Sequence, residues 1–352
     1  MTRNLLLAAL LLPMAEGVAL RTEYTADSSR RIEIESRFTI ETVDFSMERD
    51  GEPVEGGFGG GPTIDEERSI VMVDTVVEAE DGAPRQVRRS FEAVEGTSFM
   101  VMGDREMESS SECPLSGLVL ELVDEDGETS VEVLEGSEPD DEQALEGHTL
   151  TLALDALLPE DEVEAGDSWE LDGEAINHAL GFDLERAFFP PPSRDEEGEG
   201  GRGGRRGGRG MRGGGASRYF LEGDWEAEAT LGEATTEHEG VECHVVTIEA
   251  EASGELPERE RGGGGRERGG RALGLPSTAT LLENSFEIEL EATLYFSVAS
   301  GQPLHLEVEA ELSAESTREM SRRGSEMVIS SSQEGSLNYT VDVMSAETED
   351  EE

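Results

Sequence analysis

The sequence predicts a mainly β protein, built as a long-stranded antiparallel sheet curled into a half-barrel or open barrel with one helix in or across the concavity. Apolar residues alternate strictly with polar, mostly acidic ones from Phe286 to Val298 and again from Leu304 to Leu312, which is the pattern of strands with one buried face. Thirteen such residues span roughly 43 Å, about twice the usual strand length, and a sheet that long must twist and curl. The only convincing helical pattern lies between Gly173 and Phe189.

The composition excludes several functions. The chain has 27 basic and 82 acidic residues, a formal net charge of −55, and all of its basic residues are Arg because it contains no Lys. A Walker-type phosphate loop and Schiff-base chemistry both need a Lys. The negative charge opposes nucleic acids and anionic membranes and favours cations or a basic partner. We therefore expect no nucleic-acid partner.

Residues 1–19 have the pattern of a secretory signal peptide. Arg3 precedes the apolar run Leu5–Leu12, and small residues follow at Gly17–Ala19. Eight apolar residues are too few to cross a bilayer, and no Cys lies near the cleavage point to carry a lipid anchor. We expect a mature protein that begins near Leu20 and is periplasmic or secreted. A short buried helix is the alternative interpretation.

The remaining sequence predicts a single β-rich domain over residues 20–345, followed by an acidic tail at 346–352. A change of parity near Thr42 predicts a β-bulge, and the Asp-Gly step after Glu125 predicts a hairpin turn. Strands are predicted at residues 31–47, 69–79, 85–94, 97–102, 118–123, 129–134, 219–231, 241–252, 277–282, 286–298, 304–312 and 327–343.

Two segments rich in Gly and Arg interrupt this domain, at residues 193–218 and 255–275. Their composition predicts disordered insertions, since glycine-rich sequences bury little and gain little by folding. Repeats of this kind also occur in proteins that bind single-stranded nucleic acid, where aromatic residues stack on bases. No aromatic residue lies inside either tract, so we expect surface loops.

Four short motifs carry a resemblance to a known group. They are the Leu-Pro step at 158–159, Val163 to Trp169, the Gly-x-Trp of Gly223 to Trp225, and the Gly-x-x-Cys of Gly240 to Cys243. Together they resemble exported, β-rich bacterial proteins of unassigned function. The resemblance implies a fold and a compartment, and it implies no catalytic residues.

The predicted helix supplies the candidate ligand site. Its apolar stripe faces the concavity of the sheet, and Pro190 to Pro192 end it. It is either a lid over a pocket or a plain connecting helix that covers core. The residues that would line a pocket under the lid are Ile176, Leu180, Leu184, Phe188 and Phe189.

The two cysteines, Cys113 and Cys243, predict a disulfide, because an even count in an oxidising compartment favours pairing. Two isolated buried thiols are the alternative. His238 and His244 flank a Cys and several Glu and are the only weak candidates for a metal site. Their spacing matches no known metal motif, and the Glu-Gly step between them is typical of a turn. We therefore predict no metal and no cofactor.

No nucleophile elbow and no HExxH helix occurs in the sequence, so we expect a protein that is not an enzyme. Two functions fit the predicted fold. The protein is either an exported structural or interaction module with a strongly acidic surface, or a carrier for a lipid or other hydrophobic ligand, by analogy with half-barrel lipoprotein carriers. A hydrolase or metal-binding protein is a distant third. The first two differ in whether the concavity is filled or empty.

Overall fold

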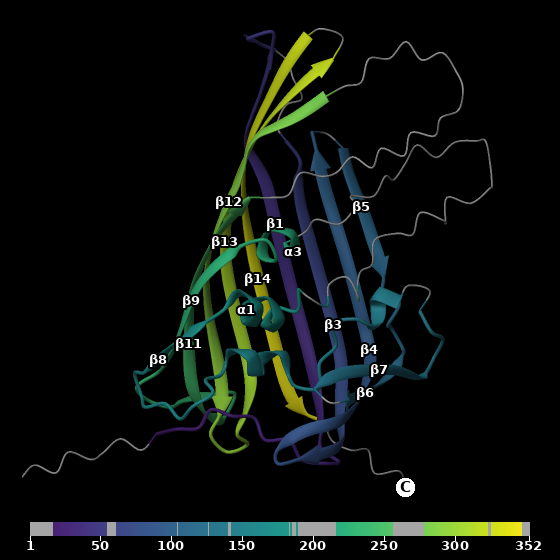
Figure 1. The fold of residues 1–352 in the computed structure, drawn as a ribbon, viewed down its shortest axis with the longest axis vertical. Coiled ribbons are helices and arrows are strands. Elements are labelled where there is room, and N and C mark those ends of the chain that lie inside the picture. The colour runs from purple at the N-terminus through teal and green to yellow at the C-terminus, as the bar shows by residue number, and fades with distance from the viewer. Residues whose placement is uncertain are drawn as a thin grey trace, which may run out of the picture.

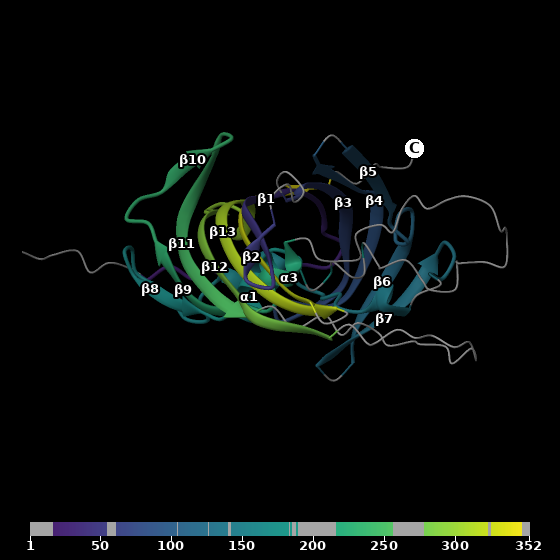
Figure 2. The ribbon, with the colours of Figure 1, turned by 90° about the horizontal axis from the view of Figure 1, so that it is seen from above.

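The computed structural model describes residues 17–54, 61–103, 105–125, 127–139, 142–182, 184, 188, 216–255, 278–322 and 325–346. Within these ranges the protein is mainly β, with one antiparallel sheet of 14 strands that does not close. The sheet curls into a half-barrel (Figure 1, and from above in Figure 2). The predicted fold class is confirmed.

The strands are β1 (Ser29–Arg49), β2 (Glu52–Pro53), β3 (Thr63–Glu80), β4 (Ala83–Met102), β5 (Arg105–Glu112), β6 (Val119–Glu125), β7 (Glu128–Glu135), β8 (Ser168–Leu171), β9 (Asp224–Leu231), β10 (Thr236–His238), β11 (Val241–Glu255), β12 (Thr278–Ser297), β13 (Gln302–Arg322) and β14 (Ser325–Ser345). The helical elements are the 3-10 helices η1 (Glu142–Leu145) and η2 (Ala153–Leu157) and the α-helices α1 (Gly173–Ala179) and α3 (Ser217–Phe220).

The main path of the sheet runs β7-β6-β4-β3-β1-β14-β13-β12-β11-β9-β8. The two ends of the chain meet at its centre, where β1 and β14 pair antiparallel from Arg30 opposite Ser345 to Arg49 opposite Met327. The short helical elements lie on the concave side of the half-barrel (Figure 1). The N- and C-terminal long strands thus join the two halves of the sheet.

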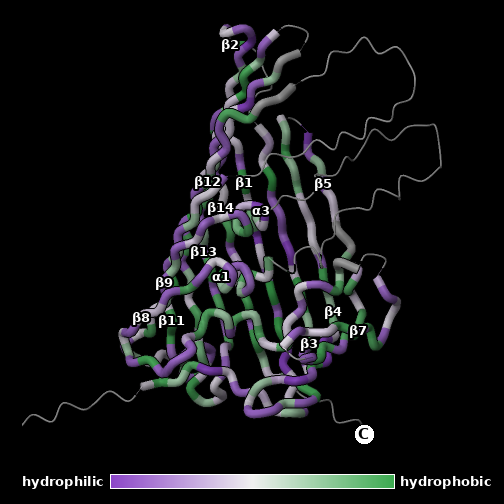
Figure 3. The backbone as a smooth tube through the Cα atoms, viewed as in Figure 1, coloured by the Kyte–Doolittle hydropathy of each residue, from purple (hydrophilic) through white to green (hydrophobic). Residues whose placement is uncertain are grey.

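The alternation seen in the sequence sorts each strand into two faces (Figure 3). Along β12, Phe286, Ile288 and Leu290 are buried, and the glutamates between them are exposed. The predicted hairpin is confirmed as β12 and β13, which run for 20 and 21 residues. The core is therefore the concave side of the sheet.

Two local predictions are also confirmed. The register of β1 against β14 shifts between Thr42 and Asp44, which places the bulge where the parity changes. Gly127 adopts φ 93° in the turn of the β6–β7 hairpin, and its N–H donates to Asp124 Oδ1 at 2.8 Å. A side-chain acceptor and a glycine with positive φ together make this turn.

The predicted helix from Gly173 to Phe189 is wrong in length. The helix α1 begins after Asp172, whose side chain caps Ala175 N, and it ends at Ala179. Gly181 follows with φ 66°, a left-handed conformation that stops a helix. The predicted helix is therefore interrupted at Gly181 and is not continuous, although Phe188 is again helical and its N–H donates to Leu184 O at 3.0 Å.

The limits predicted for the insertions also need correction. Ser217, which we assigned to the first insertion, begins α3, and the strand expected from Tyr219 starts only at Asp224. Glu255, assigned to the second insertion, is the last residue of β11. Residues 193–215 and 256–275 of the two insertions and the acidic tail beyond Ala346 lie outside the described residues.

Most of the predicted leader, residues 1–16, also lies outside the described residues. Gly17 to Ala19 are described, and Val18 pairs with Val163 through backbone hydrogen bonds of 2.7 and 3.0 Å. The cleavage site near Leu20 stays a prediction. No helix in the described part of the chain has the length and apolar character needed to cross a membrane.

Candidate functional site

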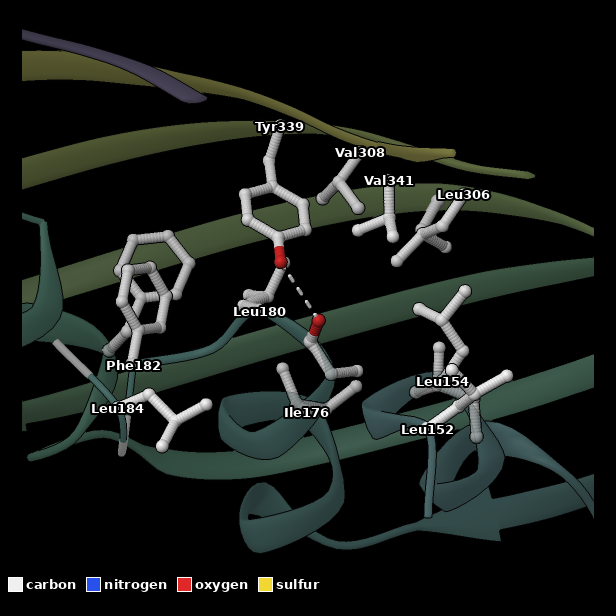
Figure 4. Packing of buried hydrophobic residues seen from close by; sticks show 14 of the residues in the cluster. Leu152, Leu154, Ile176, Leu180, Phe182, Leu184, Leu306, Val308, Tyr339 and Val341 are labelled. Atoms are coloured by element: carbon white, nitrogen blue, oxygen red, sulfur yellow. Dashed lines mark hydrogen bonds between the residues drawn. The ribbon is translucent and has the colours of Figure 1, made fainter. Parts of the chain in front are cut away.

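The concavity predicted to hold a ligand is filled by side chains. Ile176, Leu180, Leu184 and Phe188 lie together against the sheet and are only 2 to 6% exposed. In Figure 4 the side chains of Ile176 and Leu180, in and just after α1, lie on the side of the core that faces Leu306 and Val308 of β13. The Tyr339 hydroxyl of β14 donates to Ala179 O at 3.2 Å, which attaches the end of α1 to the sheet.

The free space left in this packing is very small. A void of about 10 Å³ lies between α1, η2 and strands β11 to β13. A hydrophobic ligand needs roughly 300 Å³, whereas a void of this size holds one water at most. The candidate pocket residues are therefore core residues in this structure, except Phe189, which lies outside the described residues.

A second cluster is polar and lies where β1 begins. Asp74 of β3 and Arg89 of β4 are inward cross-strand partners, 6% and 3% exposed. The Arg89 guanidinium donates to both carboxylate oxygens of Asp74, at 2.7 and 2.6 Å, and to Thr149 O at 3.2 Å. His148 completes this cluster, with its Nδ1 3.4 Å from Arg89 Nη1. We call these three side chains the Arg89 clamp.

A third cluster joins the N-terminal segment to η2. The hydroxyls of Thr22 and Tyr24 donate to the two oxygens of Asp155, and Leu152 N donates to Tyr24 Oη at 2.7 Å. The guanidinium of Arg30 lies 4.3 Å from the centre of the Tyr24 ring. Burial raises the pKa of both Tyr24 and Asp155. We call this group the Asp155 clamp.

The two clamps attach residues 142–157, which we call the cover segment, to the sheet and to the N-terminal segment. Sequence reasoning missed them, although one signal was available. Asp74 follows Ile70 and Met72 in the buried parity of its strand, and Arg89 stands between Val87 and Phe91 in the next. A charge in an otherwise apolar face predicts a buried partner, but the sequence could not show which one.

The outer face carries a regular set of carboxylates. Strand register places Glu228, Glu249, Glu291 and Glu309 directly opposite one another across β9, β11, β12 and β13. Glu226, Glu251, Glu289 and Glu311 form a second such row, and all eight are exposed. Neighbouring strands lie ~4.8 Å apart, and like charges directly opposite one another destabilise a sheet. We call these eight residues the glutamate array.

An open groove of about 460 Å³ adjoins the array on strands β14, β1, β3 and β4. By alternation its walls are outward side chains, among them Glu35, Arg37 and Glu67. Arg37 donates to Asp65 Oδ2 at 2.6 Å, so the charge of this Arg is already matched. Asn338 at the groove pairs with Glu309 of the array, which makes the two features continuous.

The predicted disulfide is wrong. Cys113 lies in the connection between β5 and β6 and Cys243 in β11, and both are buried free thiols. Five strands separate β4, the partner of β5, from β11 along the sheet. Burial raises the pKa of Cys113 to about 11, which keeps it an unreactive thiol.

The turn expected between the two weak metal candidates is present. Glu239 and Gly240 have φ 50° and 84° and join β10 to β11. The ring of His238 stacks on His305, with centroids 4.8 Å apart, and His244 pairs with Phe296 on β12. Among the residues that the structure describes, no three His, Cys, Asp or Glu are arranged to hold a metal ion.

Comparison with known proteins identifies no family. No family model matches the sequence, and no curated protein matches it. A lipovitellin structure concerned with lipid–protein interactions aligns at 6% identity and TM-score 0.36, over 94% of this chain and 27% of that one. This chain thus spans about a quarter of lipovitellin. The outer membrane protein OprG from Pseudomonas aeruginosa aligns at 6% identity and TM-score 0.22, over 94% of this chain and all of that one. Similarities at this level carry no functional argument.

Proposed function

We propose that this protein is a non-enzymatic interaction module that presents the glutamate array to a basic partner. The observation that carries the proposal is the exposed double row of carboxylates held in register by four adjacent strands. The filled concavity supports it, since a solid core makes the sheet a rigid support. The strands fix the backbone positions of the array, so only the glutamate side chains need to be ordered when a partner binds.

Strand formation by itself does not require glutamate at these positions. On β9, β11 and β12 the next outward row is Thr230, Thr247 and Thr293, also directly opposite one another, and on β13 it is Glu307. Threonine is a good strand former and brings no repulsion. The glutamate rows therefore make the sheet less stable than a neutral row would, and their fixed field attracts cations and steers basic partners.

The test compares two variants of equal net charge. Glu249, Glu291 and Glu309 change to Gln in one, and the exposed Glu52, Glu138 and Glu160, outside the array, change to Gln in the other. The probe is an arginine-rich peptide, titrated at low salt and monitored by calorimetry. We expect the array variant to bind at least tenfold more weakly than the unmodified protein, and the control variant to stay within about twofold.

Two results would contradict the proposal. One is the absence of binding by the unmodified protein at low salt. The other is an equal loss of peptide affinity in both variants, which would mean that binding depends on net charge alone. The carrier alternative requires α1 and the cover segment to move if the ligand is to lie beneath them, because the void there is about 10 Å³. Lipid that co-purifies in native mass spectra would favour that alternative.

A further inference from the structure

We infer that His148 is an acid-sensitive latch: its protonation releases residues 144–149 of the cover segment from Arg89 and opens the core beneath them. This conformational switch goes beyond the proposed function and does not depend on it. It rests on the arrangement of donors and acceptors around one buried imidazole.

The surroundings of His148 determine its protonation state. Arg89 can only donate hydrogen bonds, so His148 Nδ1 must be the acceptor of the 3.4 Å contact with Arg89 Nη1. His148 Nε2 then carries the proton and donates to Ala144 O at 3.2 Å. The neutral imidazole therefore satisfies both of its nitrogens and joins β4 to the cover segment.

A second proton would have to go on Nδ1, where it would face the Arg89 guanidinium. Asp74, on β3, cannot compensate fully, because both of its oxygens already accept from Arg89. Among the residues that the structure describes, Phe91 of β4 and Phe188 also pack against the ring, with centroids 6.0 and 6.5 Å away, and they carry no charge. Burial and the charge of Arg89 lower the pKa of His148 to about 4.

The other titratable groups that the structure describes near this site are His178, Tyr24 and Glu146. His178 of α1 contacts the segment through Thr149, with Nε2 3.4 Å from Thr149 Oγ1. Tyr24 is close enough to Arg89 to interact with it electrostatically. It stays neutral because burial raises its pKa. On the segment itself, Glu146 is exposed to solvent and lies between the two anchored residues Ala144 and His148.

The Asp155 clamp responds to acid in the opposite way. Burial raises the pKa of Asp155, so this carboxyl takes up a proton more readily than an exposed one. A protonated carboxyl still forms hydrogen bonds with Thr22 and Tyr24. Acid therefore loosens residues 144–149 and leaves η2 attached, with the hinge between Leu150 and Leu152. The opening exposes Phe91 and Phe188, each 2% exposed in the closed form.

The experiment is hydrogen exchange measured by mass spectrometry at pH 7 and pH 4, corrected for the pH dependence of intrinsic exchange. We expect amides in residues 144–149 to exchange at least tenfold faster at pH 4 than at pH 7, and faster at pH 4 than those of Leu152 and of β12 and β13. His148→Gln keeps one donor and one acceptor but does not titrate, so this variant should show no increase. His244→Gln, on β11, is the matched control and should behave like the unmodified protein.

Three results would overturn the inference. They are unchanged exchange at residues 144–149, exchange of β12 and β13 as fast as that of residues 144–149 at pH 4, and an identical increase in His148→Gln. If His148→Gln fails to fold, the unmodified protein still decides the question. Residues 144–149 that exchange faster than the sheet at pH 4 support the latch, and equal rates, which indicate global unfolding alone, reject it.

Discussion

The inner and outer faces of β11, β12 and β13 belong to the same strands and share one register, yet they affect stability in opposite directions. On the inner face, Ala250, Leu290 and Ala310 lie directly opposite one another and are buried. Their neighbours in sequence, Glu249, Glu291 and Glu309, repel one another in solvent. The same pairing that builds the core also aligns the charges.

This difference separates two roles: the inner face provides stability, and the outer face is available for binding. The inner face excludes water and is closed by α1 and the cover segment, so its residues are constrained by packing. The outer face has no packing constraint, as the neighbouring row of threonines shows, and its residues are free to serve binding. Three measurements test this separation, beginning with the largest expected effect.

Leu290→Ala and Glu291→Ala compare the two faces at adjacent positions. Leu290 is 4% exposed at the void under α1, and its truncation should lower the free energy of unfolding by about 2 to 5 kcal/mol. Glu291→Ala should change stability little or raise it, because it removes one charge that lies directly opposite two like charges, Glu249 and Glu309. Urea denaturation measures both. Equal losses would mean that the outer glutamates also support the fold.

The pH dependence of stability tests the polar part of the inner face. An unfolded histidine takes up a proton below its ordinary pKa of 6.5, whereas native His148 does so only near 4. Unfolding therefore binds a proton between these values, so the free energy of unfolding should fall as the pH drops from 6.5 to 4. The total loss is about 3 kcal/mol.

Asp155 changes the free energy of unfolding in the opposite direction as the pH falls. Its raised pKa means that the native carboxyl is protonated at higher pH than the unfolded one. His148→Gln isolates the histidine contribution. Denaturation at pH 7, 5.5 and 4 should show a flatter profile in this variant than in the unmodified protein. Parallel profiles would show that other groups dominate the acid sensitivity.

The smallest effect concerns the outer face alone. Changing Glu249, Glu291 and Glu309 to Gln should raise the free energy of unfolding by about 1 kcal/mol at low salt, since three directly opposed pairs are removed, the third with Glu228. At 1 M NaCl screening should abolish most of the gain. Melting temperatures at both salt concentrations measure it. A loss of stability at low salt would mean that cations bound from the buffer bridge the rows.

The sequence by itself determined most of the long strands, the face on which their residues lie, the bulge after Thr42, and the turns at Gly127 and Gly240. These features depend on local geometry, because a period of two and a positive φ are properties of adjacent residues. It divided β4 into two strands and missed β5 and β8. It placed the start of α1 at Gly173, and the structure shows that Asp172 caps this end. The end of α1 was misjudged because an apolar stripe continues past Gly181, where the backbone leaves the helical conformation.

Only the tertiary structure decided which segments meet. Pairing of β1 with β14 joins residues about 300 positions apart, and the approach of His148 to Arg89 depends on how the cover segment crosses the sheet. The separation of Cys113 from Cys243 follows from strand order, which alternation does not encode. Whether the concavity is filled is also a tertiary property. Alternation identifies a buried face, but the side chains that cover that face come from other parts of the chain.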